Sequence, residues 1–509
     1  MPGADFLQLD PAQAPPGGLT TWLTDTLRAA VADGRLAVGD RLPATRVLAG
    51  QLAVSRGVVV EAYQRLTDEG LLGGRHGGGT VVRAGPLTAA PRAPGAGGSG
   101  GRTPAPGTRE SGGRNGAPGG TAGHPRNPAA PGAVVVPGGW TGPAGPGPYR
   151  ATDVEFDLTP GRPDLSAFPR AAWGRAERAA LASAPDADLG YGDPRGVPAL
   201  REALAGWLAR NRGLRAHPDE ILVVNGVAQG LVLLARVLAA RGRTRVAFED
   251  PGSRGMREHL ERWDLRIVPV PVDDAGLDTG ELARTGADVV VTTPAHQFPT
   301  GVVLAAGRRR ELIDWARERD GLIVEDDYDA EHRYDRPPVA ALHSLAPEHV
   351  LHVGSVSKTL APAIRLGWMV APPGWREELT EAKYWLDLAC PALPQHALAG
   401  LVTSGAFERH LRLVRRRHRA RRDALLAALA AHLPGAAVHG VAAGLHLLVT
   451  LPDGVRDDDV AARALAEGVL VQPLSAHRLA PGPPGLVIGY ATTPPDRLRE
   501  AVRRLARAR

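Results

Sequence analysis

A long stretch that cannot form a core divides this 509-residue chain. Residues 84–150 consist mainly of Gly, Pro, Ala, Ser and Thr, with almost no large apolar side chains. Such a composition cannot bury enough surface to offset the entropy lost on ordering, so we expect a disordered linker with some stiff stretches. The chain is also too long for one ordinary core. We therefore expect one domain over residues 17–83 and a second over residues 151–509.

Lysine is rare in this basic chain. The formal net charge is +6 and the isoelectric point about 9.8, which permits nucleic-acid binding without proving it. Lys358 and Lys383 are the only two lysines among 60 basic residues. A lysine kept in an arginine-rich chain suggests a position that requires an amine able to lose its proton.

Other features exclude classes of protein. No run of about 18 uncharged apolar residues occurs, so we expect no membrane span. Residues 1–18 carry acids and prolines without a basic start and an apolar stretch, so we expect no secretory signal. Cys390 is the only cysteine, which excludes an internal disulfide framework and fits a reducing cytoplasm. We expect it to fill apolar space rather than to react.

Apolar runs alternate with amphipathic stretches in the second domain. The runs are short, end in turn residues and are typical of buried strands. Strand and helix in alternation favour a mostly parallel sheet covered on both faces, in which ligands bind at the carboxyl ends of strands. We expect strands within 221–226, 245–252, 287–294, 321–328 and 350–355, and helices within 196–213 and 307–320.

The first domain has a pattern of short helices followed by a hairpin. A turn within 39–52 opens a helix with Thr45 near its start, and Ser55 is a plausible N-cap for a further helix that closes at Gly70. Residues 71–82 predict two strands with a glycine tip. Two short helices joined by a tight turn, plus a hairpin, make a winged helix-turn-helix. The preceding helix is indicated by Leu19, Leu23, Leu27, Ala30 and Val31, with Gly34 as its stop.

The order of motifs in this domain resembles the GntR family. The motifs are G-x-L-x-x-G-x-R-L-P-x-T-R-x-L-A, then L-x-V-S-R, A-Y-x-x-L-x-x-E-G and G-x-G-T. In that family arginines and hydroxyls around the turn contact phosphates and base edges, and the wing tip enters the minor groove. The alternative is that these arginines lie on a solvated helix face. The resemblance implies that the DNA-binding residues are Arg41, Thr45, Arg46, Ser55, Arg56, Gly57, Arg75 and His76.

The second domain contains groups that pyridoxal-phosphate (PLP) chemistry requires. A lysine must hold the cofactor's aldehyde, and a carboxylate must keep the pyridine nitrogen protonated. Asp326 lies at an expected strand end, and Tyr328, two residues on, shares its side of an extended chain. The free N–H groups of Val227 and Ala228, where a helix opens after a strand, would cradle a phosphate.

The sequence GSVSKTLAPAIRLG is reminiscent of the fold-type I PLP enzymes. It places Lys358 after an expected strand, between Ser355 and Ser357 on one side and Arg365 on the other. The resemblance implies that Lys358 is the catalytic, cofactor-bound lysine. It further implies that TTPAHQFPTG places the polar side chains of His296 and Gln297 over the cofactor, and that Tyr191 of YGDPRG reaches the partner subunit's phosphate.

A GntR-like DNA-binding domain joined to such a PLP domain resembles the MocR/GabR-type regulators. The implied fold is a winged helix-turn-helix followed by an α/β PLP-dependent transferase of fold type I, with a small C-terminal α+β subdomain. Promoter DNA, a domain-swapped head-to-tail homodimer and a cytoplasmic location without membrane contact are implied as well. Residues 407–429 resemble the long helix into the small subdomain, although their arginines could alternatively form a second nucleic-acid surface or, as we expect, a solvated face.

Two departures touch the substrate side of the expected site. An aminotransferase usually clamps the substrate carboxylate with an arginine two residues before the glycine of a closing strand, and this chain has Val487 there, with Arg478 as the nearest substitute. Ser253 also stands where related chains often carry an aromatic residue that packs on the cofactor.

These observations favour a regulator that senses PLP, or an adduct of PLP with a small amino compound. The alternative is a PLP-dependent aminotransferase with a tethered DNA-binding domain. We expect transimination or half-reactions rather than steady turnover, and we assign no metal ligands.

Overall fold

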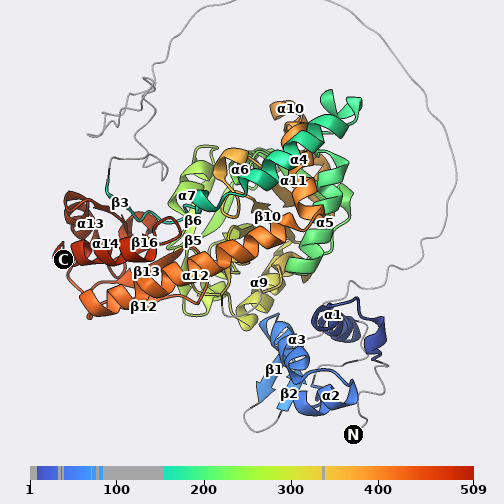
Figure 1. Ribbon diagram of the computed structural model, residues 1–509, viewed down its shortest axis with the longest axis horizontal. Helices are drawn as coiled ribbons and strands as arrows, with labels where there is room; N and C mark the ends of the chain where they lie inside the picture. Colours follow the sequence, from blue (N-terminus) through green and yellow to red (C-terminus); the bar gives the residue numbers. More distant parts are fainter. Residues whose placement is uncertain are drawn as a thin grey trace, which may run out of the picture. The chain divides into compact units, whose positions relative to one another are not determined.

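The structure is a computed structural model that describes most of the chain outside the expected linker (Figure 1). The linker prediction for residues 84–150 lies outside the described part, as do Gly34, Gly70 and His76. Within the described part, no helix has the length and apolar character needed to cross a membrane. The described residues are 9–32, 36, 39–69, 71–75, 79–83, 154–334 and 339–508.

The N-terminal domain has three helices and a hairpin around its own apolar core. Its elements are α1 (Leu19–Ala32), α2 (Thr45–Gln51), α3 (Arg56–Asp68), β1 (Leu72–Arg75) and β2 (Gly79–Val82). The two strands pair antiparallel. This is the winged helix-turn-helix that the motifs predicted. The core includes Leu23, Leu27, Ala30 and Val31 from the expected face of the first helix.

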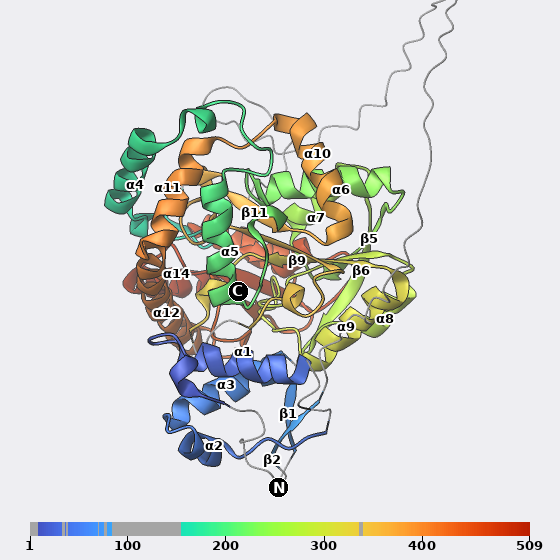
Figure 2. The ribbon, with the colours of Figure 1, turned by 90° about the vertical axis from the view of Figure 1, so that its right-hand side faces the viewer.

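An eight-stranded sheet forms the centre of the second domain (Figure 2). Its strands are β4 (Ile221–Val224), β5 (Arg245–Asp250), β6 (Arg266–Asp273), β7 (Gly276–Leu277), β8 (Val289–Thr292), β9 (Leu322–Asp327), β10 (Val350–Ser355) and β11 (Gly367–Val370). They lie in the order β4-β11-β10-β9-β8-β5-β6-β7, and only β7 and β11 run antiparallel to their neighbours. The mostly parallel sheet is therefore confirmed.

Helices cover both faces of this sheet (Figure 2). Alternate strand residues point to opposite faces: Leu222 and Val224 pack on the side of α6, whereas Ile221 and Val223 pack on the side of α5. One face carries α6 (Val227–Ala240), α7 (Arg254–Glu261) and α10 (Arg376–Asp387). The other carries α5 (Pro198–Arg212), α8 (Thr279–Arg284), α9 (Ala306–Arg319) and α11 (Ala392–Thr403), with α4 (Arg170–Ser183) packed on α11.

The C-terminal part is a small α+β subdomain. Its antiparallel sheet has the order β12-β13-β16-β15, and a separate pair joins β14 to β3. The long helix α12 contacts both α11 and α14 and so connects the two parts (Figure 1). The elements are β3 (Phe156–Asp157), α12 (Ala406–His432), β12 (Ala437–His439), β13 (His446–Thr450), α13 (Asp457–Ala466), β14 (Val469–Leu470), β15 (Gln472–Pro473), β16 (Gly485–Gly489) and α14 (Pro495–Arg507).

Candidate functional site

The expected PLP residues gather at one edge of the large sheet. Strands β4, β9 and β10 run in the same direction, so their carboxyl ends share that edge. Asp326 lies near the end of β9 and Ser355 ends β10. The Ser355 hydroxyl accepts a hydrogen bond from the backbone N–H of Ser357 at 3.4 Å. This turn leads directly to Lys358.

Lys358 is the lysine at this edge. Its Nζ donates to the carbonyl oxygen of Gly161 at 2.5 Å. Gly161 has a φ of +74°, and a Cβ there would lie 3.3 Å from that Nζ, so the position favours glycine. Lys383 lies on α10 next to the first turn of α6, where it is fully buried and forms an ion pair with Asp387 at 2.7 Å. Of the two lysine side chains, Lys358 is the one that is partly exposed.

Two consecutive carboxyl groups at the end of β9 have opposite surroundings. Asp326 is buried, and its Oδ1 has no hydrogen-bond partner among the described residues. Burial, helped by the negative charge of Asp327, raises the pKa of Asp326 to about 7, against the opposing effect of Lys358. Asp327 points to the other face, where its Oδ2 lies 2.5 Å from Nε of the buried Arg212. Asp327 also has one oxygen, Oδ1, without a hydrogen-bond partner among the described residues, but its other oxygen is paired with a buried arginine.

The start of α6 has the properties of an anion site. The helix begins at Val227 after Gly226, whose φ is +78°. The N–H groups of Val227 and Ala228 have no partner within the helix, and the helix dipole favours an anion there. Arg365 donates to the carbonyl of Asn225, and a Cβ on Gly226 would lie 2.8 Å from its guanidinium. Backbone donors and a guanidinium thus meet at one point.

A histidine joins the expected tyrosine to an acid that sequence reasoning missed. Nδ1 of His296 lies 3.1 Å from the hydroxyl of Tyr328 and 2.9 Å from Oδ2 of Asp329. Burial and the neighbouring carboxylates raise the pKa of Tyr328, so its hydroxyl keeps its proton at neutral pH. The signal for Asp329 was its place just after Tyr328, but nothing in the sequence pointed to His296 as its partner.

Gln297 and Tyr191 are placed differently. The Gln297 amide donates to the carbonyls of Pro251 at 2.8 Å and Phe298 at 2.7 Å, and its oxygen accepts from Thr300. In this structure Gln297 holds its own loop, and a cofactor contact stays a prediction. Tyr191 is 83% exposed, so its side chain faces outward rather than into the site of its own chain.

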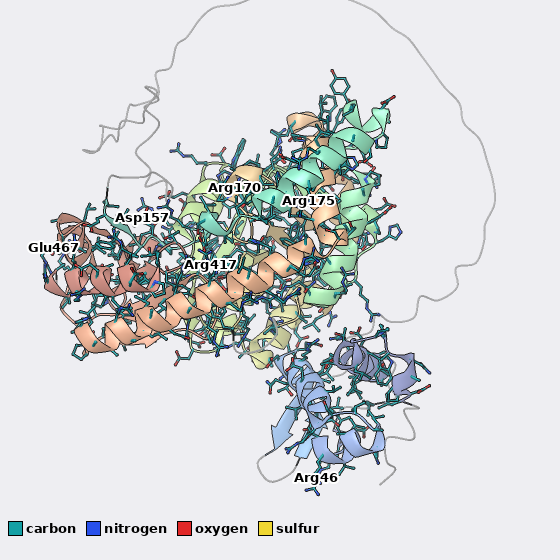
Figure 3. The ribbon with its side chains drawn as sticks, in the orientation of Figure 1. Arg46, Asp157, Arg170, Arg175, Arg417 and Glu467 are labelled. Carbon is teal, nitrogen blue, oxygen red and sulfur yellow. The ribbon has the colours of Figure 1, made fainter. Side chains whose placement is uncertain are left out.

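The expected DNA-contacting groups lie around α2 and α3. The Ser55 hydroxyl caps α3 by accepting from the N–H of Val58 at 3.4 Å. Arg46 projects outward from α2 (Figure 3). Arg41, Arg46, Ser55, Arg56 and Gly57 are exposed, Thr45 is half-buried, and the side chain of Arg75 and all of His76 lie outside the described part.

Some arginines of α12 serve the fold. Arg417, labelled in Figure 3, and Arg421 each lie 2.8 Å from Oδ2 of the buried Asp164. These two side chains fasten the helix to the start of the domain. The alternative of a second nucleic-acid surface on α12 stays open for its other arginines.

Comparison with known proteins gives both domains a family. Residues 20–82 match the model of bacterial regulatory proteins of the gntR family, and residues 156–505 match that of aminotransferases of class I and II. The pyridoxine biosynthesis transcriptional regulator PdxR of Corynebacterium glutamicum is 31% identical over 95% of this chain and 94% of its own. The probable rhizopine catabolism regulatory protein MocR of Rhizobium meliloti is 31% identical over 96% of this chain and 92% of its own.

The second domain also resembles solved enzymes. The kynurenine aminotransferase of Pyrococcus horikoshii covers 70% of this chain and 91% of its own length, with a TM-score of 0.64 and 29% identity. Fold and site thus define a transcriptional regulator that combines a DNA-binding domain with an aminotransferase-like domain. The chain belongs to the MocR/GabR-type regulators. The class I and II aminotransferase family is PLP-dependent.

Proposed function

We propose that this regulator binds PLP at the sheet edge of its second domain and that this binding changes its affinity for promoter DNA. One observation carries the proposal: a buried carboxylate oxygen of Asp326 without a partner among the described residues, at the same edge as Lys358. A buried carboxyl without a partner is costly. A protonated pyridine nitrogen supplies both the hydrogen bond and the positive charge that Asp326 lacks.

The other residues of this edge fit the remaining parts of PLP. Lys358 supplies the amine that takes up the aldehyde, and the Tyr328 hydroxyl is a donor for the phenolic oxygen. The phosphate suits the start of α6, the hydroxyls of Ser355 and Ser357, and Arg365. When bound, the cofactor supplies an electron sink for amine chemistry. His296 holds the Tyr328 hydroxyl and is itself held by Asp329.

We further propose a domain-swapped homodimer in which Tyr191 reaches the phosphate of the partner subunit. Its 83% exposure is compatible with this role, because the side chain faces outward from its own chain. A ligand acts on such a dimer only by binding its conformations with different affinities. We propose that the second domain senses PLP, with or without an amine, and performs no steady turnover.

Absorbance spectra of the full-length protein test the cofactor assignment. With added PLP, wild type is expected to develop a band near ~420 nm that borohydride removes, as a lysine-bound pyridoxal does. Lys358→Ala is expected to lack this band, whereas Lys383→Ala, which removes the chain's other lysine, should retain it. No band in wild type would overturn the assignment.

Salt-dependent DNA binding tests the first domain. We expect Arg46→Ala and Arg56→Ala each to weaken binding of a short random-sequence duplex and to reduce the slope of log affinity against log salt by about 1. Arg65→Ala is the matched control, because Arg65 lies on α3 with Arg56 but pairs with Glu61 at 3.1 Å. Unchanged affinity and slope in both variants would contradict the assignment.

A further inference from the structure

An apolar wall lies on one face of the small sheet. We use this name for Val487, Leu448 and Leu474, which are 0%, 5% and 0% exposed, with Phe298 packed against them. Val487 on β16 pairs directly with Leu448 on β13. Its neighbours Leu486 and Ile488 point the other way, into the core shared with α12 and α14. Val487 therefore faces the large domain.

This wall lies beside the cofactor lysine. Gly489, at the end of the same strand, donates its N–H to the carbonyl of Leu158 at 2.7 Å. The segment that starts there continues to Gly161, whose carbonyl accepts from Lys358. On the other side, the ring of Phe298 meets that of Tyr328 edge-on with centroids 6.3 Å apart. The wall thus packs against segments that contact two of the groups assigned to PLP, Lys358 and Tyr328.

Two histidines beside the wall are uncharged at neutral pH. The rings of His446 and His477 contact Phe298, with centroids 4.9 and 5.1 Å away. Burial lowers the pKa of His446 to about 3 and that of His477 to about 4, so both are neutral. The described charged side chains in this region are the carboxylate of Asp329, which lies against His296, and the guanidinium groups of Arg254 and Arg257, whose charges act on His477. Arg254 is paired with Glu258 at 2.6 Å.

Two arginines that are close in sequence to Gly161 and to Leu474 have other neighbours than the wall. Arg162, next to Gly161, forms an ion pair with Asp157. Arg478 lies so close to Gly482 that a Cβ there would collide with its guanidinium, and the charges acting on it are those of Asp250 and Asp457. A ligand carboxylate at the wall would lose its water and meet methyl groups and neutral imidazoles instead.

We propose that the ligand side of this site rejects carboxylates, so that the signal of this regulator is PLP itself rather than an amino acid. This inference rests on the proposed PLP binding and narrows it. Amines that carry no carboxylate can still approach Lys358. Among the described residues of the wall, none carries a charge that would bind an amino acid more tightly than its decarboxylated counterpart. The wall closes the site and excludes carboxylates, and it does not bind a particular ligand.

The test compares matched pairs on the PLP-loaded full-length protein. The pairs are phenylalanine with 2-phenylethylamine and 4-aminobutyrate with propylamine, compared as free-base concentrations. Borohydride then fixes the pyridoxyl group either on Lys358 or on the added amine, and mass spectrometry measures the fraction displaced from Lys358. In wild type we expect each amine to act at the same or lower concentration than its carboxylate partner. PLP alone should change the affinity for DNA, and adding either amino acid should change it further by less than about twofold.

A charge placed in the wall should reverse this order. Val487→Arg is expected to favour the amino acids by about tenfold or more relative to wild type, because an arginine pairs with a carboxylate by charged hydrogen bonds. Val487→Gln, polar but uncharged, is the matched control and should not. The wild-type comparison decides the question even where a variant fails to fold.

Two failures remain distinguishable. A preference of wild type for amino acids by about tenfold, with the PLP band intact, would overturn this inference alone. Loss of that preference in Arg478→Ala would then identify Arg478 as the carboxylate clamp. Absence of the PLP band in wild type would overturn the proposed function and this inference together.

Discussion

The two sides of the site differ in polarity: one is polar and charged, and the other is apolar. The side assigned to cofactor anchoring presents an unpartnered carboxyl, an amine, hydroxyls and a helix start, at Asp326, Lys358, Ser355 and Val227. The ligand side presents the apolar wall around Val487. The first side offers charges and hydrogen-bond donors to a charged molecule, whereas the second side offers methyl groups, which exclude water.

Under the proposed assignment, holding a cofactor and choosing a substrate are separable tasks in one fold. The anchoring groups sit at the ends of strands in the large sheet, and the wall sits on the small sheet. A chain can therefore keep the first set while the second loses its charge. The predictions below test whether each side does only its own task.

The largest expected effect is on stability, and it comes from breaking the buried ion pair between Arg212 and Asp327. Asp327→Ala leaves Arg212 buried without its partner and should lower the free energy of unfolding by about 3–5 kcal/mol. Urea unfolding of the PLP-free protein measures this. The double variant Arg212→Met with Asp327→Leu removes both charges and should recover much of the loss; no recovery would mean that the pair is not the cause.

The pH dependence of stability should separate Asp326 from Asp327. The unfolded chain ionises Asp326 near pH 4, whereas the folded chain does so only near pH 7. Between these values the ionised unfolded state is favoured, so stability falls as pH rises and levels off above about pH 7. PLP-free wild type should lose about 2–4 kcal/mol relative to Asp326→Asn across that window.

Urea unfolding at several pH values checks this difference. Glu331, whose pKa is also raised by burial, to about 8, is present in both proteins and cancels in the comparison. A difference that stays constant from pH 4 to pH 8 would show that Asp326 is not held in its neutral form by burial.

Asp326 should contribute to the affinity for the cofactor without contributing to the stability of the fold. Asp326→Asn removes the charge that pairs with the pyridine nitrogen and should raise the dissociation constant for PLP by about 10- to 100-fold. Equilibrium titration of the absorbance band measures it. Because the oxygen has no partner to lose among the described residues, the variant should be at least as stable as wild type at neutral pH. A less stable variant with unchanged affinity would reverse the assigned roles.

The smallest expected effect concerns the wall. Val487→Ala removes buried methyl groups and should lower the free energy of unfolding by about 1–2 kcal/mol, while PLP affinity changes by less than about twofold. Thermal unfolding and PLP titration in parallel measure both quantities. A large loss of PLP affinity in this variant would mean that the wall also anchors the cofactor.

Local patterns predicted the elements and the residues at strand ends. The runs ILVV and LIVEDD became β4 and β9 because apolar residues between turns have few alternatives in a buried sheet. Lys358 stood out because lysine is so rare in this chain. Ser55 was found as an N-cap because capping is a local interaction.

Contacts between distant segments were beyond local patterns. The Gly161 carbonyl that accepts from Lys358 is 197 residues away in the chain, and Asp329 is 33 residues from His296. The saturation of the Gln297 amide depends on how its loop folds back on Pro251. Each of these partners is an ordinary polar group whose role arises only from tertiary packing.

The burial of Lys383 makes the protein convenient to label. With that amine fully buried in an ion pair, Lys358 is the single partly exposed lysine side chain of a chain whose other cations are nearly all guanidinium groups. Amine-selective acylating reagents scarcely touch guanidinium. One peptide in a mass spectrum, modified when Lys358 is accessible and protected when it is not, would report site occupancy in a crude mixture without any engineered tag.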